Sequence, residues 1–272
     1  MNLSINSTWK LNNGVKIPVM GFGTWGLEGK TAINATRWAI ETGYRLIDTA
    51  FIYGNEVEVG KAIKASEVPR EEIFLTTKVW QTDMRYKKTF KSFERSLKNL
   101  DTDYLDLFLI HWPREKRLET WRAMEKIYEE GKVKSIGVSN FTISNLKELL
   151  SHSETIPVVN QVEFSPFLYQ KDLLDFCHQH KIQLEAYSPL TRANKLNNPV
   201  IKDISDKYKK STAQILLRWA LQHQIIAIPK SSSKKHIGEN ANIFDFVIEE
   251  ADMEKLDKLD EGFRVVEDTI FN

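Results

Sequence analysis

The segment Gly43-Tyr44-Arg45-Leu46-Ile47-Asp48-Thr49-Ala50 contains the end of one element and the whole of the next. Gly43 follows a helical pattern over residues 31–42 and is expected to end it, because glycine adopts the left-handed backbone of a helix C-terminus at little cost. Residues 46–49 then form a strand candidate, and its apolar start suits a parallel strand that is covered on both faces. The segment therefore predicts an α/β fold with the carboxylate of Asp48 at the end of a strand.

The same alternation continues on both sides of this segment. The other strand candidates are Pro18–Phe22, Ile73–Val79, Leu105–Ile110, Ser135–Val138, Val158–Glu163, Gln183–Tyr187 and Ile225–Ile228. Helical patterns cover Thr31–Thr42, Tyr86–Leu100, Leu118–Glu130, Ser144–Ser151, Lys171–His180, Thr212–Gln222 and Asp252–Leu259. The strands recur at a step of roughly 25–30 residues, which is the length of a βα unit.

We therefore predict a single (β/α)8 TIM barrel that occupies residues 1–272 as one domain. An open, doubly wound sheet is the competing architecture. At the N-terminus, the segments Ser7–Leu11 and Val15–Pro18 flank Asn13-Gly14, a strong turn signal, so a β-hairpin is expected ahead of the barrel. The longer interval between Tyr187 and Ile225 has room for an extra loop and helix.

The composition argues against several other classes of protein. The chain has 272 residues, of which 42% are hydrophobic and 28% charged, as in ordinary globular domains. A net charge of +1 provides no strong field to hold nucleic acid or an anionic membrane, and residues 1–10 contain no apolar signal-peptide core. Because the chain also lacks a long apolar run and has a single cysteine, Cys177, we expect a cytoplasmic protein without nucleic-acid or membrane partners, and no metal site is predicted.

One motif near the N-terminus points to a different fold. Gly21-Phe22-Gly23-Thr24-Trp25-Gly26 matches the dinucleotide-binding pattern G-x-G-x-x-G of Rossmann folds, and Asp48 follows where a ribose-binding acid would lie. The context argues against that interpretation, because the motif follows a hairpin, Trp25 occupies the tight turn, and a better phosphate-binding candidate lies near the other end of the chain. A Rossmann dehydrogenase is kept as an alternative.

Polar residues end three consecutive strand candidates. Asp48, Lys78 and His111 each stand at a carboxyl end, and Tyr53 lies in the loop five residues after Asp48. The carboxyl ends of parallel barrel strands meet at one rim, where barrel enzymes place their chemistry. Each residue alone also has an ordinary structural explanation, as a cap, a packed aromatic or a solvated charge. Their common placement favours one shared site.

These four side chains suit the reduction of a carbonyl group, which needs a hydride on carbon and a proton on oxygen. Tyrosine, with a pKa near 10, is a weak acid at neutral pH, and a buried lysine beside it lowers that pKa by stabilising the phenolate. A carboxylate keeps the lysine charged and oriented. A histidine can hydrogen-bond the carbonyl oxygen and fix its orientation.

Other strand ends suggest a place for a cofactor. Ser139, Asn140 and Gln161 are polar groups suited to a carboxamide, and the ring of Tyr187 could stack on a nicotinamide. The segment from Ile228 to His236 runs from the end of the last strand to a helix-like stretch, so its hydroxyls, lysine and backbone N–H groups could hold a phosphate. A solvated basic loop is the alternative explanation of that segment.

Several long motifs resemble the aldo-keto reductase family over essentially the whole chain. They are Gly43–Ala50 followed by Tyr53, Gly54, Glu56 and Gly60; Leu105-Asp106-Leu107 leading into His111-Trp112-Pro113; Lys134–Phe141; Ala186–Leu190; and Ile228–Ser231 through Glu239-Asn240. The resemblance implies a barrel fold, NADPH as cofactor and a monomer. It also implies that Gly21–Trp25 is the first barrel strand and its loop.

The resemblance further implies a role for each site residue. Tyr53 would be the general acid, Lys78 and Asp48 would tune it, and His111 would orient the carbonyl of a small-molecule substrate. The cofactor would contact Ser139, Asn140 and Gln161 at its carboxamide, Tyr187 at its nicotinamide ring, Thr24, Ser188 and Leu190 at its pyrophosphate and ribose, Lys230, Ser231 and Ser232 at its 2′-phosphate, and Glu239 and Asn240 at its adenine. Trp25, Trp80 and Trp112 would form apolar walls around the substrate.

Two departures from the family pattern bear on function. His236 stands where the family usually has an arginine that stacks on adenine and reinforces 2′-phosphate binding, so we predict a weaker preference for NADPH over NADH. The stretch Thr191–Asn198 and the C-terminal tail are short, as in compact microbial reductases with open pockets and broad substrates. A regulatory protein that keeps the barrel and the cofactor is the alternative, although the intact catalytic set argues for an enzyme.

Overall fold

The computed structural model describes residues 3–266, so the two ends of the predicted domain, residues 1–2 and 267–272, lie outside the described residues. The predicted hairpin is confirmed. Its strands β1 (Thr8–Lys10) and β2 (Lys16–Pro18) pair antiparallel, and Gly14 in the connection has a φ of 89°, which glycine accommodates without strain.

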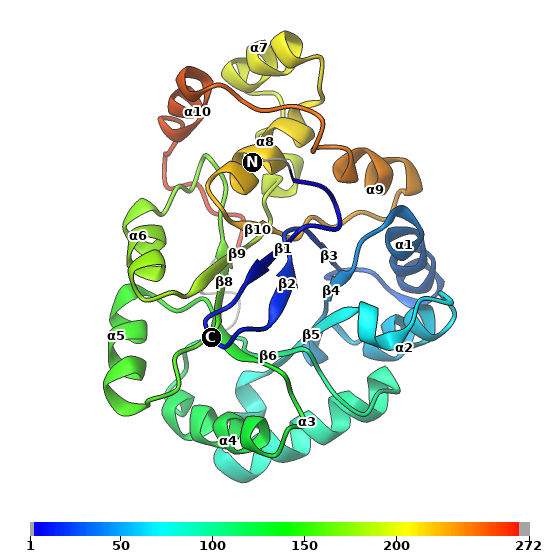
Figure 1. Cartoon of the computed structure of the whole chain (residues 1–272), viewed down its shortest axis with the longest axis vertical. Coiled ribbons are helices and arrows are strands. Elements are labelled where there is room, and N and C mark those ends of the chain that lie inside the picture. Colours follow the sequence, from blue (N-terminus) through cyan, green and yellow to red (C-terminus); the bar gives the residue numbers. More distant parts are fainter. Residues whose placement is uncertain (1–2, 267–272) are drawn as a thin grey trace.

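Eight parallel strands form the centre of the molecule. They are β3 (Gly21–Gly23), β4 (Leu46–Asp48), β5 (Phe74–Val79), β6 (Leu107–Ile110), β7 (Ile136–Ser139), β8 (Val159–Glu163), β9 (Gln183–Tyr187) and β10 (Ile226–Ala227). Each strand pairs with the next along the chain, and a parallel bridge from Met20 to Ala227 joins the first to the last. This closed order confirms the predicted barrel and excludes the doubly wound sheet (Figure 1).

Helices surround the strands. They are α1 (Gly29–Thr42), α2 (Glu56–Lys64), α3 (Tyr86–Leu100), α4 (Arg117–Glu129), α5 (Ile143–His152), α6 (Lys171–Gln179), α7 (Pro199–Tyr208), α8 (Thr212–Gln222), α9 (Lys234–Ala241) and α10 (Glu250–Asp257). The backbone of Gly43 is left-handed, with a φ of 108°, and its N–H bonds to the last turn of α1 as predicted. None of the helices in the described chain is long and apolar enough to cross a membrane.

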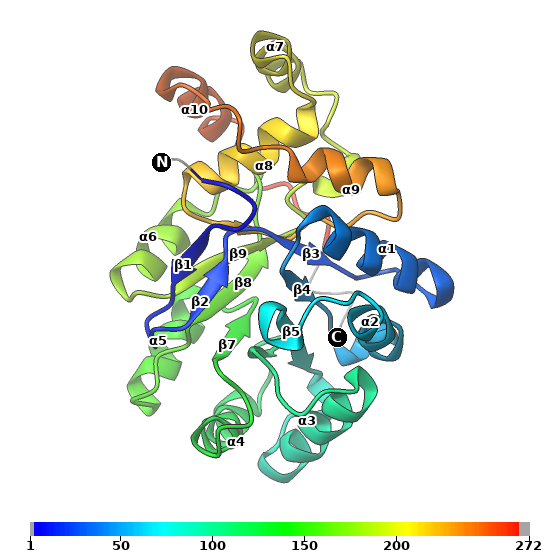
Figure 2. The same ribbon diagram turned by 45° about the vertical axis from the view of Figure 1, so that its right-hand side comes forward.

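Two parts of the sequence prediction differ from the structure. The strand expected over Pro18–Phe22 starts later, because Pro18 pairs with Thr8 in the hairpin and β3 begins at Gly21. Helix α2 was not among the predicted helices. The predicted extra helix after Tyr187 is α7, which lies outside the ring beside α8 and α10 (Figure 2).

The glycines of the Rossmann-like motif serve the barrel itself. A Cβ atom on Gly21 would lie 2.5 Å from Leu46 Cγ, and one on Gly23 would lie 3.0 Å from the carbonyl oxygen of Ile228. The Gly23 N–H also bonds to the carbonyl of Pro229 at 3.1 Å, across the seam where the barrel closes. The Rossmann interpretation is therefore wrong, since these glycines allow strands to approach each other and open no nucleotide-binding turn.

The barrel interior is apolar at one end and polar at the other. Leu46 and Leu109 belong to a buried apolar cluster that also contains Leu11 and Ile17 of the hairpin segment, so the hairpin closes the amino end of the barrel. Side chains alternate along a strand, and Asp48 therefore points to the same interior as Leu46, but one layer nearer to the carboxyl rim. The polar residues of the predicted site consequently gather at the open rim.

Candidate active site

Asp48 and Lys78 form a buried ion pair at the carboxyl ends of β4 and β5. Lys78 Nζ lies 2.7 Å from Asp48 Oδ1 and 2.8 Å from Oδ2, and it also donates to the carbonyl of Thr49 at 2.9 Å. Lys78 has no exposed surface and Asp48 is 2% exposed. All three ammonium hydrogens thus have acceptors, which is the condition for a charged lysine away from water.

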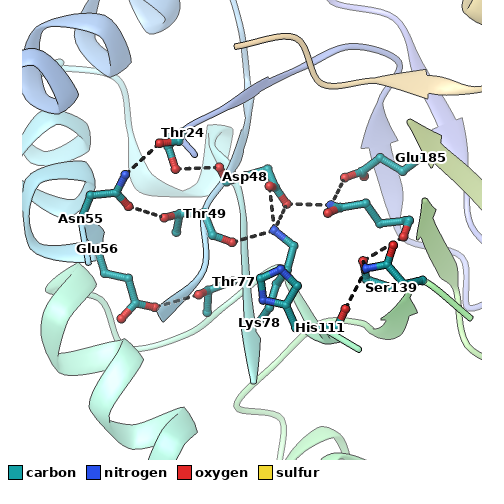
Figure 3. A network of polar contacts seen from close by, with 12 residues as sticks. Thr24, Asp48, Thr49, Asn55, Glu56, Thr77, Lys78, His111, Ser139 and Glu185 are labelled. Atoms are coloured by element: carbon teal, nitrogen blue, oxygen red, sulfur yellow. Dashed lines mark hydrogen bonds and ion pairs between the residues drawn. The ribbon is translucent and has the colours of Figure 1, made fainter. Parts of the chain in front are cut away.

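Tyr53 and His111 lie next to this ion pair. Tyr53 ends a short 3₁₀ helix, Phe51–Tyr53, and its ring centroid is 5.1 Å from Lys78 Nζ. The rings of Tyr53 and His111 meet edge to face, with centroids 5.7 Å apart. The three residues predicted at strand ends and the loop residue Tyr53 are therefore brought together, as Figure 3 shows for Asp48, Lys78 and His111.

Asn55 holds the loop that carries Tyr53. Its Nδ2 donates to the carbonyls of Thr24 and Leu27 at 2.8 and 2.9 Å, and its Oδ1 accepts from Thr49 Oγ1 at 2.9 Å. Every one of these groups is buried, so the two loops after β3 and β4 are fixed to each other (Figure 3). Asn55 could not be predicted as a site residue, because nothing in the local sequence tells which carbonyls its side chain reaches.

Glu56 anchors the start of α2 in a similar way. It is 2% exposed, and it accepts from Thr77 Oγ1 at 2.7 Å and from Asn99 Nδ2 at 2.9 Å. These bonds connect the helix that follows Tyr53 to β5 and α3. The position of the tyrosine is thus set from both sides of its loop.

The pKa values of Tyr53 and Lys78 follow from burial and from their mutual contacts. Burial raises the pKa of the Tyr53 hydroxyl, Lys78 lowers it, and Asp48 raises it, with burial as the largest effect. Burial lowers the pKa of Lys78 and is the largest single effect, but Asp48, Tyr53 and Glu185 together outweigh it, so the pKa rises above its usual value. The expected effect of the lysine on the tyrosine is present, yet the net shift is upward, so Tyr53 carries its proton at neutral pH.

His111 is held as a neutral ring. Burial and the charge of Lys78 together lower its pKa well below the usual value. Asn140 Nδ2 donates to the His111 carbonyl at 3.0 Å, and the edge of Trp80 packs against the ring at a centroid distance of 5.1 Å. His111 Nδ1 is buried and has no hydrogen-bond partner among residues 3–266. A neutral imidazole can donate one hydrogen bond without adding charge to the site.

Ser139, Asn140 and Tyr187 form a hydrogen-bonded row along the rim. Tyr187 donates its hydroxyl to Asn140 Oδ1 at 2.8 Å, Asn140 Nδ2 lies 3.1 Å from Ser139 Oγ, and Ser139 Oγ donates to the carbonyl of Gln161 at 2.8 Å. Asn140 has a φ of 62°, a left-handed conformation that asparagine tolerates. The structure therefore brings together the residues predicted to face a carboxamide.

A cavity of about 800 Å³ runs from the catalytic cluster to the loop after β10. Its lining includes these predicted residues: Trp25, Asp48, Tyr53, Trp80, His111, Trp112, Ser139, Asn140, Gln161, Tyr187, Ser188, Leu190, Lys230, Ser231, His236, Glu239 and Asn240. A cavity of this size is typical of sites for cofactor-sized ligands.

Two residues expected in the cofactor site do not line the cavity. Thr24 has no exposed surface, and its hydroxyl donates to the Asp48 carbonyl at 3.0 Å, so its side chain braces the loop before α1. Ser232 is exposed and lies two residues before the start of α9. Arg192, which the sequence analysis did not identify, lines the cavity and lies 4.2 Å above the ring of Trp25.

Comparison with known proteins adds an independent observation. The Aldo/keto reductase family pattern matches residues 19–261. The chain is 51% identical over 267 residues to a glyoxal reductase of Bacillus subtilis (strain 168), with 97% of each chain covered. It is 41% identical over 261 residues to a methylglyoxal reductase of Escherichia coli (strain K12), with 94% of each covered.

Solved structures agree with these matches. An aldo-keto reductase enzyme from a Medee basin deep-sea metagenome library is similar with a TM-score of 0.94 and 46% identity, covering 95% of this chain and 97% of the other. An aldo-keto reductase of Bombyx mori, in complex with NADP, is similar with a TM-score of 0.93 and 33% identity, covering 98% and 97%.

Proposed function

Because this chain belongs to the aldo/keto reductase family, we propose that it reduces aldehydes or ketones to alcohols with NADPH, and that Tyr53 is the general acid. The observation that carries the assignment of Tyr53 is the fully buried Lys78–Asp48 ion pair beside it at the open end of the barrel. A buried charge pair is costly, and here it lies next to a protonated phenol in a cavity, which supports a catalytic use.

The polar groups of the cavity fit the cofactor in type and order. At one end, Ser139, Asn140 and Gln161 offer hydroxyl and amide groups suited to a carboxamide, with the Tyr187 ring beside them. At the other end, Lys230 and Ser231 offer a cation and a hydroxyl suited to a phosphate. NADPH, when bound, supplies the hydride that the carbonyl carbon receives.

The remaining cofactor contacts are assigned from the chemical type of each side chain and its position along the chain. Ser188 and Leu190 follow β9 and line the middle of the cavity, where we assign them to the pyrophosphate and ribose. Ser232 is exposed and does not line the cavity, and it is assigned to the 2′-phosphate only as the chain neighbour of Ser231, which does line it together with Lys230. His236, Glu239 and Asn240 lie on α9, and we assign them to the adenine end. NADH is expected to serve as a weaker second cofactor.

The proton moves from Tyr53 to the substrate. The Tyr53 hydroxyl gives its proton to the carbonyl oxygen as the carbonyl carbon gains the hydride, and the phenolate that remains lies beside the Lys78 ammonium. Asp48 keeps that ammonium in place. The neutral His111 donates a hydrogen bond to the same carbonyl oxygen, which orients the substrate without competing as an acid.

Small carbonyl compounds fit the mouth of the cavity. Trp25, Trp80 and Trp112 line it with apolar surface, and Trp25 is 48% exposed, so the entrance is open. Similarity to glyoxal and methylglyoxal reductases supports small dicarbonyls as substrates. We also propose a monomer in the cytoplasm that needs no nucleic-acid or membrane partner, in keeping with the low net charge.

Turnover of the wild-type protein tests the proposal. Oxidation of NADPH and of NADH is followed by absorbance, with methylglyoxal or a nitrobenzaldehyde as acceptor. We expect oxidation that depends on the carbonyl compound and is faster with NADPH. Tight NADPH binding without turnover on any carbonyl would contradict the proposal and support a regulatory protein of the same fold.

A further inference from the structure

Gln161 lies between two carboxyl groups inside the barrel. Its Nε2 donates to Asp48 Oδ2 at 2.8 Å and to Glu185 Oε1 at 2.6 Å. A side-chain amide has two hydrogens, so both are used by these contacts. Gln161 also lines the cavity. The polar atom that it can offer to a ligand is therefore its carbonyl oxygen, Oε1.

Glu185 is an unusual neighbour for this amide. It lies in register with Gln161 on the adjacent strand β9 and has no exposed surface. Its Oε2 is buried and has no hydrogen-bond partner within residues 3–266. Burial and the nearby Asp48 raise the pKa of Glu185 to about 8, so it is a neutral acid at pH 7 and still accepts through Oε1. None of the proposed catalytic steps uses this carboxyl group.

We propose that Glu185 is a positioning residue that, together with Asp48, fixes the Gln161 side-chain amide so that its carbonyl oxygen receives the NH2 group of the nicotinamide carboxamide. With the amide flipped, Gln161 Oε1 would face the Asp48 carboxylate, which has no hydrogen to donate, so that contact would become repulsive. Asp48 therefore selects the orientation of the amide, and Glu185 holds it there by accepting the second amide hydrogen. The inference rests on the proposed function, because it assumes a nicotinamide cofactor in this cavity.

The same hydrogen-bond network connects Gln161, the proposed carboxamide-binding residue, to Tyr53, the proposed proton donor. Asp48 accepts from Gln161 and from Lys78, and Lys78 lies beside Tyr53. The groups that face Glu185 are thus Asp48 from β4, Tyr53 from the loop after β4, Lys78 from β5 and Gln161 from β8. Ionisation of Glu185 at alkaline pH would add a negative charge close to the nicotinamide, which favours the cationic, oxidised ring over the reduced one.

Binding measurements with whole and truncated nucleotides test the proposal. Glu185→Leu removes the acceptor, and we expect it to weaken NADPH binding about tenfold. It should leave the affinity for 2′,5′-ADP, which lacks the nicotinamide, unchanged within about twofold. That second ligand also reports whether the variant is folded. Glu185→Gln keeps a neutral acceptor and is expected to restore wild-type NADPH affinity at neutral pH.

Two further readouts separate positioning from a merely structural role. Glu185→Leu combined with Gln161→Leu should bind NADPH no more weakly than Gln161→Leu alone, because Glu185 acts through Gln161. Between pH 7 and 9, binding of NADP⁺ relative to NADPH should strengthen in the wild type and stay constant in Glu185→Gln, since only glutamate ionises.

The outcomes distinguish this inference from the proposed function. If the wild type binds NADPH and Glu185→Leu binds it equally well, or if the variant loses NADPH and 2′,5′-ADP affinity to the same extent, the inference is wrong and the proposed function stands. If the wild type fails to bind NADPH at all, the proposed function is wrong and the inference fails with it.

Discussion

Lys78 keeps a positive charge at a position that water does not reach. Two oxygens of Asp48 and the carbonyl of Thr49 take its three hydrogens, and this complete set of acceptors replaces hydration. The charge lies beside the Tyr53 ring, where a phenolate forms if the tyrosine gives up its proton. We therefore expect the free energy of unfolding and the turnover both to depend on the Lys78–Asp48 pair. Different variants of the pair should separate these two effects.

Replacing Lys78 with methionine, alone and together with a change of Asp48, separates the effect on stability from the effect on activity. Lys78→Met leaves the Asp48 carboxylate buried without its counterion, so we expect a loss of roughly 3–5 kcal/mol of unfolding free energy. Urea unfolding measures this loss. The double variant Lys78→Met/Asp48→Asn removes both charges and should regain much of the stability while remaining inactive. A single variant as stable as the wild type would show that the pair is not buried as described.

The raised pKa of Glu185 predicts how the free energy of unfolding changes with pH. Its pKa rises from 4.5 to about 8 in the folded chain, so the folded state binds more protons than the unfolded state within that range. The contribution of this group to stability is therefore complete below pH 4.5 and is lost as the pH rises to about 8.

The free energy of unfolding is measured for the wild type and for Glu185→Gln across that pH range. The difference between the two proteins isolates the contribution of Glu185. We expect the wild type to lose stability relative to the variant as the pH rises, by on the order of a few kcal/mol in total. Parallel curves for the two proteins would contradict a neutral Glu185 in the folded state.

At the scale of elements, the positions of the barrel strands could be predicted and some helices could not. A buried parallel strand needs a short apolar run, and that pattern is visible in segments such as Leu105–Ile110. Helix α2 was missed because Glu56–Lys64 contains a central Gly60 and β-branched valines, which weaken a helical pattern. The reason for the glycine is tertiary: a Cβ atom there would lie 2.5 Å from the carbonyl oxygen of Leu100.

Two glycines inside helices provide a matched test of this packing. Gly60→Ala in α2 must push against the backbone of Leu100, so we expect a loss of about 1–3 kcal/mol of unfolding free energy despite the better helix propensity of alanine. Gly238→Ala in α9 meets nothing within 4 Å and should be neutral or gain up to about 1 kcal/mol. Chemical denaturation of both variants measures the difference. Equal effects would mean that α2 and α3 are not in close contact.

The candidate site was predictable to the extent that it lies at strand ends. Asp48, Lys78 and His111 could be found because each follows an apolar run, and parallel strands share one rim. Asn55 and Glu185 could not be found in this way, because their roles depend on contacts with other strands and loops that no local pattern specifies. The sign of the Tyr53 pKa shift was also out of reach, since it depends on how completely the ring is buried.

For the molecule as a whole, one cavity connects the catalytic cluster to the loop and helix after the last strand. Lys230 and His236 line its far end, so under the proposed function the choice between NADPH and NADH is made at a distance from the catalytic cluster. His236→Arg adds a permanent charge and a planar group there. We expect the ratio of kcat/KM for NADPH over NADH to rise about tenfold.

The matched control for this change is His236→Gln, which adds no charge. The expected ratio for this variant is that of the wild type or lower. Steady-state kinetics with both cofactors and one carbonyl substrate gives both ratios. A similar rise in the two variants would mean that charge at this position does not select the cofactor.

The central claim is that Tyr53 gives the proton that completes carbonyl reduction. Tyr53→Phe removes one hydroxyl from a half-buried ring, and the exposed Tyr86→Phe is the matched control. Carbonyl-dependent NADPH oxidation and NADPH affinity are measured for both variants and for the wild type. The account predicts that Tyr53→Phe loses turnover by about two to four orders of magnitude while binding NADPH as the wild type does, and that Tyr86→Phe changes neither. Turnover retained within about tenfold in Tyr53→Phe would contradict it and assign the proton to another group.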